Sequence, residues 1–197
     1  PRIPSSIKID VIIQEVSNLP GNITAHPKRI KPWGTAHAVW CAKDVIKTGF
    51  AIINADDFYD KKHLVPFGEY LPRIFTFLGF SEVLTKEVGN FSPGKWEQPM
   101  AYLAGEKIGF LICYESIFPV LTRLAGKSGA NLLVNATNDM WFANTAAPQQ
   151  HLQMAALRAI EVRKPLLRAA NSGISALIDE WGRIRKKLDF GEIGVLN

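Results

Sequence analysis

Residues 107–116, with the sequence KIGFLICYES, decide the fold of this chain and point to its chemistry. The first part is a continuous apolar run that ends at Cys113, and polar residues follow at once. A short apolar run of this kind predicts a buried strand over residues 107–113. Because the strand ends at a cysteine, we expect a thiol at the edge of a sheet, where reactive groups are commonly placed.

Helices and strands are predicted to alternate after this strand. The helices are expected at residues 119–126 and 148–163, each with a proline near its start. The second of them carries its apolar residues at helical spacing. Four strands are expected at residues 131–135, 166–170, 174–178 and 183–188. This alternation predicts an α/β layered domain.

The chain before residue 107 has weaker signals. Strands are expected at residues 7–13 and 50–53, and a short helix at residues 73–80. Loops are expected at residues 17–35, 65–72 and 89–99, which are rich in proline and glycine.

Length and composition bound the class of protein. The chain has 197 residues, 47% of them hydrophobic and 21% charged, which predicts one globular domain over residues 1–197. No apolar stretch reaches 18 residues and no signal peptide is visible, so we expect no membrane-spanning helix in this chain.

The net charge of +5 predicts a mildly basic surface, or attraction to anionic lipid headgroups as the sharper alternative. The basic residues are scattered, which argues against nucleic acid as a partner. The two cysteines and the spacing of the histidines argue against a disulfide scaffold and a zinc site, and we expect no metal or cofactor.

Cys113 is either a buried structural thiol or a nucleophile. A nucleophile needs a lowered thiol pKa, which a strand-to-helix turn and a nearby lysine can supply. Lys61 is the expected partner, with Lys62 as its competitor. The backbone amide of Tyr114 would be placed to stabilise an oxyanion. His63 is expected to be a hydrogen-bonded structural residue, because nothing local supports a Cys–His hydrolase.

Polar and aromatic residues follow the strand predicted at residues 131–135. Asn135, Asn138 and Asp139 are expected to form either a turn or a polar rim beside the site. Trp141 and Phe142 are expected to pack in the core, or to bind a lipid chain or a membrane interface.

Four segments of the chain resemble the nitrilase superfamily, and within it the nitrilase-like domain of apolipoprotein N-acyltransferases. They are residues 59–72 (YDKKHLVPFGEYLP), 111–115 (LICYE), 135–142 (NATNDMWF) and 148–173 (PQQHLQMAALRAIEVRKPLLRAANSG). The resemblance implies an αββα sandwich, here lacking part of its N-terminal strand–helix–strand region. It also implies a Glu-Lys-Cys catalytic set.

By position, Cys113 resembles the family's nucleophile and Lys61 its lysine. Glu69 resembles a second important carboxylate, and Tyr114 and Glu115 resemble neighbours of the nucleophile. The implied reaction moves an acyl chain from a phospholipid, through a Cys thioester, to the amine of a diacylglyceryl-cysteine lipoprotein. The implied location of the parent protein is the bacterial inner membrane, with the catalytic domain facing the periplasm. Asn138, Trp141 and Phe142 are the substrate-binding candidates.

The chain departs from the family at the general base. The family's glutamate follows a tryptophan, and if Trp40 is that tryptophan, Ala42 stands where the glutamate belongs. Glu15 and Asp44 are alternative carboxylates. We therefore expect impaired acyl transfer, because loss of general base help costs about 10²–10⁴-fold. The alternatives are a soluble carbon–nitrogen hydrolase (an amidase) and a non-catalytic remnant domain.

Overall fold

The structure is a computed structural model of the chain. It describes residues 59–73, 91–103, 105–139, 142, 145–171, 173–192 and 196. The strands expected at residues 7–13 and 50–53, and the helix expected at residues 73–80 beyond its first residue, lie outside this part of the chain.

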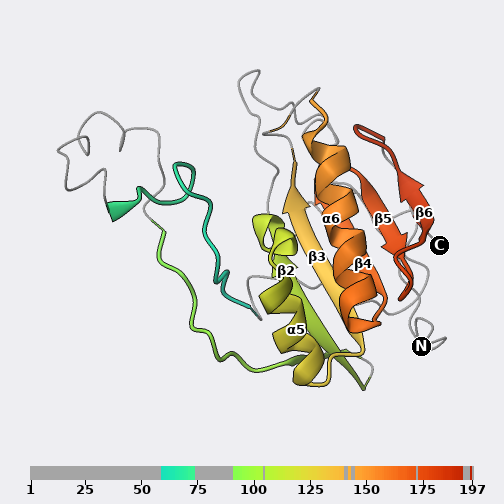
Figure 1. The fold of residues 1–197 in the computed structure, drawn as a ribbon, viewed down its shortest axis with the longest axis horizontal. Helices are drawn as coiled ribbons and strands as arrows, with labels where there is room; N and C mark the ends of the chain where they lie inside the picture. Colours follow the sequence, from blue (N-terminus) through green and yellow to red (C-terminus); the bar gives the residue numbers. More distant parts are fainter. Residues whose placement is uncertain are drawn as a thin grey trace, which may run out of the picture.

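The described residues form one six-stranded mixed sheet whose strands follow one another in chain order (Figure 1). The three central strands are parallel, while the first strand and the last two run antiparallel to their neighbours. The strands are β1 (Ala101–Leu103), β2 (Glu106–Ile112), β3 (Leu132–Asn138), β4 (Leu166–Asn171), β5 (Ser175–Ile178) and β6 (Ile184–Leu188).

Two helices make the crossovers between the parallel strands, and both cover the same face of the sheet (Figure 1). Helix α5 (Pro119–Lys127) joins β2 to β3, and α6 (Ala147–Val162) joins β3 to β4. Gly109 in β2 lets α5 lie close, because a Cβ at that position would stand 2.8 Å from the Cβ of Ala125. Arg163 ends α6 in the left-handed conformation, with φ 53°.

Both faces of the central strands are buried, whereas β6 is mostly exposed. Towards the helices, Leu111 and Leu133 pack against the apolar side of α6, including Leu152. On the opposite face, Ile108 and Leu132 pack together and are almost inaccessible. Burial on both faces is typical of parallel strands and suits the layered arrangement that the sequence predicts.

The predicted α/β class is confirmed, and the elements from Cys113 onwards lie within a few residues of their predicted bounds. The strand predicted at residues 131–135 continues to Asn138, because Asn135 and Thr137 find hydrogen-bond partners inside the protein. Strand β1 was not predicted, since three residues are too few to show a period.

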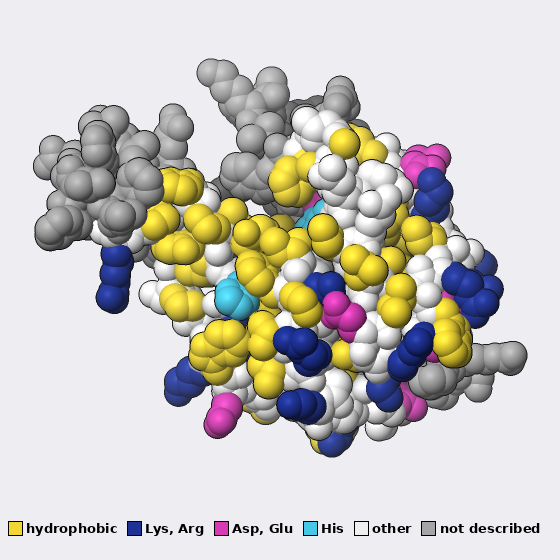
Figure 2. All heavy atoms as spheres, viewed as in Figure 1, with side chains coloured by type: hydrophobic (Ala, Val, Ile, Leu, Met, Phe, Trp, Pro, Cys, Tyr) yellow, Lys and Arg dark blue, Asp and Glu magenta, His cyan; other side chains and the backbone are white. Residues whose placement is uncertain are grey.

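Basic side chains are spread over the face of the molecule shown in Figure 2, and some of them lie on the side formed by β5 and β6. Arg183 and Arg185 both donate to Asp179, and Lys187 pairs with Asp189. These acidic partners neutralise part of the positive charge there. Among the described residues, no helix has the length and hydropathy needed to cross a membrane.

Candidate functional site

Cys113 is the first residue of a short 3-10 helix, η1 (Cys113–Ile117), that begins directly where β2 ends. Its φ of 51° lies in the left-handed region, which non-glycine residues seldom adopt outside functional sites. The thiol is free and half-buried. It therefore lies at the carboxyl ends of the parallel strands, where open α/β sheets bind their ligands.

Glu115 binds the preceding loop to this turn. Its carboxylate is fully buried and accepts four hydrogen bonds. Oε1 accepts from the Tyr59 hydroxyl (3.1 Å) and from the backbone amides of Lys62 (2.6 Å) and His63 (3.1 Å). Oε2 accepts from the amide of Ile112 at 2.8 Å. Glu115 thus fixes residues 59–63 against the Cys113 turn, and its lone pairs are engaged by these donors.

The two candidate lysines have different partners. Lys61 Nζ lies 2.6 and 2.8 Å from the two oxygens of Glu69. The amide of Val65 also donates to Glu69, at 2.8 Å, which fixes the carboxylate. The Lys61 side chain is only 11% exposed, so it is not an ordinary solvated lysine. Because its carboxylate accepts hydrogen bonds from Lys61 Nζ, Glu69 is the acid–base candidate among the described residues.

Lys62 points elsewhere. Its Nζ lies 5.0 Å from the centre of the Tyr59 ring. Burial lowers the pKa of Lys62, and the nearby Glu115 carboxylate opposes that change. Burial also raises the pKa of Tyr59, with help from Glu115, so the Tyr59 hydroxyl stays a donor. Lys62 therefore belongs with the structural contacts around Glu115, and Lys61 remains the better match to the predicted partner of the thiol.

Aromatic packing covers the same loop. The His63 ring stacks on Phe118 at 4.2 Å and meets Trp96 edge-on at 5.4 Å. The Tyr114 ring packs edge-on against Phe118 at 5.1 Å. His63 is thus a packing residue. The amide of Tyr114 lies in the first turn of η1, where amides have no acceptor within the helix.

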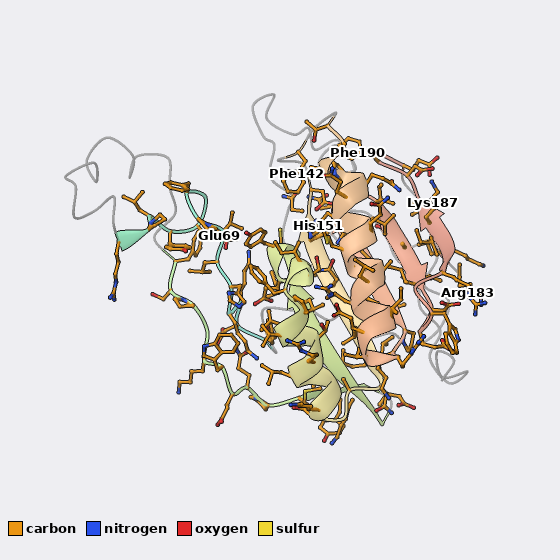
Figure 3. The ribbon with its side chains drawn as sticks, viewed as in Figure 1. Glu69, Phe142, His151, Arg183, Lys187 and Phe190 are labelled. Atoms are coloured by element: carbon orange, nitrogen blue, oxygen red, sulfur yellow. The ribbon has the colours of Figure 1, made fainter. Side chains whose placement is uncertain are left out.

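A buried polar network lies on the other side of the turn. Arg168 in β4 donates to Asn135 Oδ1 and, at 2.6 Å, to Asp139 Oδ2. His151 in α6 places Nδ1 2.9 Å from Asp139 Oδ1. Burial would raise the pKa of Asp139, but the hydrogen bond from His151 and the charge of Arg168 hold it below its usual value. In Figure 3, Glu69 and His151 lie on either side of the turn after β2.

This network corrects one prediction from the sequence. Asn135 and Asp139 were expected in a turn or in a polar rim beside the site; Asn135 lies instead within strand β3, and both side chains are fully buried. They are buried because Arg168 supplies the donors that their oxygens need. His151 and Arg168 were not singled out. Two sequence features could have pointed to them: Arg168 is a charged residue inside an apolar strand, and His151 stands at the start of the apolar face of a helix.

The three substrate-binding candidates have different surroundings. Phe142 meets the His151 ring edge-on at 6.2 Å, so it borders the buried network. Asn138 is exposed at the end of β3. Trp141 lies outside the described residues, as do Ala42, Glu15 and Asp44. Their roles stay predictions. Among the described residues, no three His, Cys, Asp or Glu side chains gather in a way that could hold a metal ion.

The sequence profile of the carbon–nitrogen hydrolase family matches residues 32–197, so the chain belongs to that family. The family includes curated relatives of this chain that are named apolipoprotein N-acyltransferase. The chain is 48% identical over 139 residues to the apolipoprotein N-acyltransferase of Geobacter metallireducens and 49% identical over 140 residues to that of Allorhizobium ampelinum. Each match covers 70% of this chain and 26% of the relative, so the matched region is about a quarter of each relative's length.

Solved structures of amidases are also similar to this chain. The NitN amidase of Nesterenkonia sp. AN1 superimposes with a TM-score of 0.48 and 23% sequence identity, covering 71% of this chain and 50% of the amidase.

Proposed function

We propose that this chain is a catalytic nitrilase-like domain of an apolipoprotein N-acyltransferase, with Cys113 as its nucleophile. The substrates would be a phospholipid as acyl donor and a lipoprotein with an N-terminal diacylglyceryl-cysteine as acceptor. The observation that carries the proposal is the hydrogen-bonded link from Glu115 to residues 59–63. It joins the segment that holds Lys61 and Glu69 to the strained turn that holds the thiol. The name of the relatives supports acyl transfer to the amine of an apolipoprotein. The phospholipid donor and the diacylglyceryl-cysteine are what the resemblance of the four sequence segments implies.

In the first half-reaction, the thiolate of Cys113 attacks the ester carbonyl of the phospholipid. The carbonyl π electrons move to oxygen, and the developing oxyanion is stabilised by the Lys61 ammonium and the amide of Tyr114. The ester C–O bond then breaks, the lysophospholipid oxygen takes from Glu69 the proton that the Cys113 thiol had given up, and a thioester remains on the protein. Phe142, with Asn138 and Trp141, would border the acyl chain.

In the second half-reaction, the amine of the lipoprotein attacks the thioester, and the thiolate leaves. The amine must lose a proton for this step, and a general base contributes about 10²–10⁴-fold. Glu69 is the base that the geometry supports, because it already shares hydrogen bonds with Lys61. Since Glu69 also holds the lysine, we expect it to serve the amine less well than a dedicated glutamate, and the thioester to accumulate.

The test is a two-step assay with the full chain. Incubation with phospholipid vesicles should add one acyl chain to Cys113, detected by mass spectrometry and removed by hydroxylamine. Addition of a diacylglyceryl lipopeptide should then release the acyl chain as an amide more slowly than the thioester formed. Cys113→Ser should abolish the modification. Absence of any acyl adduct on a folded chain would refute the proposal. Transfer as fast as acylation would refute the expected impairment.

The second candidate is an amidase, which the family name itself favours. The same thiolate and lysine would cleave a small amide and water would release the acid. Hydrolysis of short aliphatic amides by the chain, lost on Cys113→Ser, with no acyl adduct from phospholipid, would favour this candidate. A chain that does neither, although its thiol is folded and accessible, would be a non-catalytic domain.

For the parent protein, we propose association with the bacterial inner membrane and a catalytic domain that faces the periplasm. The support is the set of bacterial relatives with this name.

A further inference from the structure

The buried network beneath Cys113 has no part in the mechanism above. It joins β4, the end of β3, α6 and η1 through charged side chains that water does not reach. Burying charged groups is costly unless they are paired and hydrogen-bonded. These buried charges lie near the end of the strand that bears the thiol, so we looked for a function that would explain their cost.

We propose that Arg168 is a positioning residue for Cys113: it supplies fixed positive charge behind the thiolate, while Asp139 and His151 hold that charge and the strained turn in place. The proposal rests on the proposed role of Cys113 as nucleophile, and it assigns the activation of the thiol to a second cation besides Lys61.

The first support is the clamp on the turn. The carbonyl oxygen of Cys113 lies 3.1 Å from His151 Nε2 and accepts from the Ser116 hydroxyl at 3.2 Å. A carbonyl oxygen only accepts, so this contact is a hydrogen bond in the tautomer that carries a proton on Nε2. On the other side of the ring, Nδ1 lies 2.9 Å from Asp139 and 3.0 Å from Arg168. A left-handed residue persists only where contacts over-determine it, and these contacts do so.

The second support is the rigidity of the cation. Arg168 is inaccessible to solvent, and its guanidinium is held from three directions. Nε donates to the carbonyl of Ile174 at 3.2 Å, and the other two nitrogens donate to Asn135 and Asp139. Burial lowers the pKa of Arg168, while Asp139 and a Cys113 thiolate oppose the change through their negative charge. In space, Arg168 reaches the Cys113 turn through one ring: its Nη2 lies 3.0 Å from His151 Nδ1, and His151 Nε2 lies 3.1 Å from the Cys113 carbonyl oxygen.

The third support is the balance of charge around the thiol. From the η1 side, Glu115 carries a negative charge whose donors are a hydroxyl and backbone amides, all neutral. This charge disfavours a thiolate. The segment held by Glu115 brings the Lys61–Glu69 pair, which has no net charge. Asp139 offsets part of Arg168. Arg168 is a further cation behind the turn, and its positive charge counters the unfavourable effect of Glu115 on the thiolate.

A different interpretation of the same atoms is a Ser–His–Asp triad. Ser116 Oγ lies 2.7 Å from His151 Nε2, and Asp139 lies on the other ring nitrogen. Ser116 is fully buried, however, and its hydroxyl donates to the Cys113 carbonyl. A substrate cannot reach this oxygen. Ser116 therefore belongs to the contacts that hold the turn, and it is not a nucleophile.

The experiment measures the rate of alkylation of Cys113 by iodoacetamide against pH. It uses the full chain with Cys41→Ser, so that a single thiol reacts. Arg168→Met should raise the pH midpoint of alkylation by about one unit, and lower the rate at neutral pH about tenfold. Asp139→Asn should shift the midpoint downwards, because it removes a negative charge and leaves Arg168 in place. A role in packing alone would not produce opposite shifts.

The matched control is Arg158→Met. Arg158 is also buried, donates to the carbonyl of Ile117 in η1 at 2.9 Å, and pairs with Glu161. Its loss should reduce thermal stability and leave the midpoint unchanged. If Arg168→Met does not fold, the sign of the Asp139→Asn shift decides. An upward shift, no shift, or equal shifts for both arginines overturns the proposal. Alkylation needs no acyl donor, so failure of the acyltransfer proposal would be seen separately.

Discussion

Replacement of Glu115 by glutamine tests whether this carboxylate assembles the site. Glu115→Gln keeps the size of the side chain and one carbonyl oxygen, which can stay with the three donors at Oε1. The new amide group then faces the amide of Ile112, which loses its acceptor. The three remaining bonds become bonds to a neutral acceptor.

The magnitude follows from these four bonds. Hydrogen bonds to charged groups contribute about 1.5–3 kcal/mol, against about 0.5–1.5 kcal/mol for neutral ones. Three weakened bonds and one unsatisfied donor would cost about 4–6 kcal/mol. Relief from burying a charge offsets part of this, so we expect a net loss of about 3 kcal/mol. For a chain of this size, that lowers the thermal midpoint by about 6–12 °C.

The assay is thermal unfolding followed by circular dichroism, together with acylation of Cys113. Release of residues 59–63 should misplace Lys61, and a misplacement of about 1 Å costs about 10²-fold in rate. The control is Glu161→Gln, which removes a partly exposed carboxylate and should cost less than about 1 kcal/mol. If Glu115→Gln loses no more stability than Glu161→Gln, the assignment of Glu115 as the link is wrong.

Three further predictions concern other parts of the structure. Glu69→Gln should slow acyl transfer about 10²–10⁴-fold in a chain that still folds; normal transfer by the folded variant would contradict this. Gly173→Ala places a Cβ 2.7 Å from Asp139 Oδ2 and should cost about 1–3 kcal/mol in urea unfolding, whereas Gly68→Ala meets only ordinary contacts and should be almost neutral. Asp179 has a pKa of about 2, below its usual 3.8, because bonds from Arg183 outweigh the opposing effect of burial; its stabilisation is complete above 3.8 and is lost as pH falls through about 2. Asp179→Asn should therefore flatten the fall of the urea midpoint over that range, and an unchanged slope would contradict the assignment.

The sequence predicted the strands after Cys113 well. Each strand shows as a run of apolar residues, and such a run can be recognised from residues that are adjacent in the sequence. The sequence did not predict β1, whose Tyr102 is exposed and whose three residues carry no pattern. The pairing of Lys61 with Glu69 was within reach, because eight residues separate them in a single loop.

The buried network was out of reach of such reasoning. Arg168 meets Asp139 only because β4 pairs with β3 in a register that aligns Asn171 with Asn138. No local pattern encodes that register. Likewise, Glu115 could be assigned as a neighbour of the nucleophile, but not as the acceptor for a loop 53 residues upstream. Long-range polar contacts depend on topology, which local sequence patterns express only weakly.

Because the strands lie in the sheet in the order in which they are synthesised, each strand can pair with its predecessor as it leaves the ribosome. The contacts that close the thiol turn do not follow this order. Asp139 and His151 emerge before Arg168, so in a nascent chain that ends at α6 the Asp139 carboxylate has no arginine partner. Such an intermediate should resist completion of the turn until β4 arrives. The backbone of Cys113 would then reach its left-handed conformation only late in synthesis, after the last parallel strand has joined the sheet.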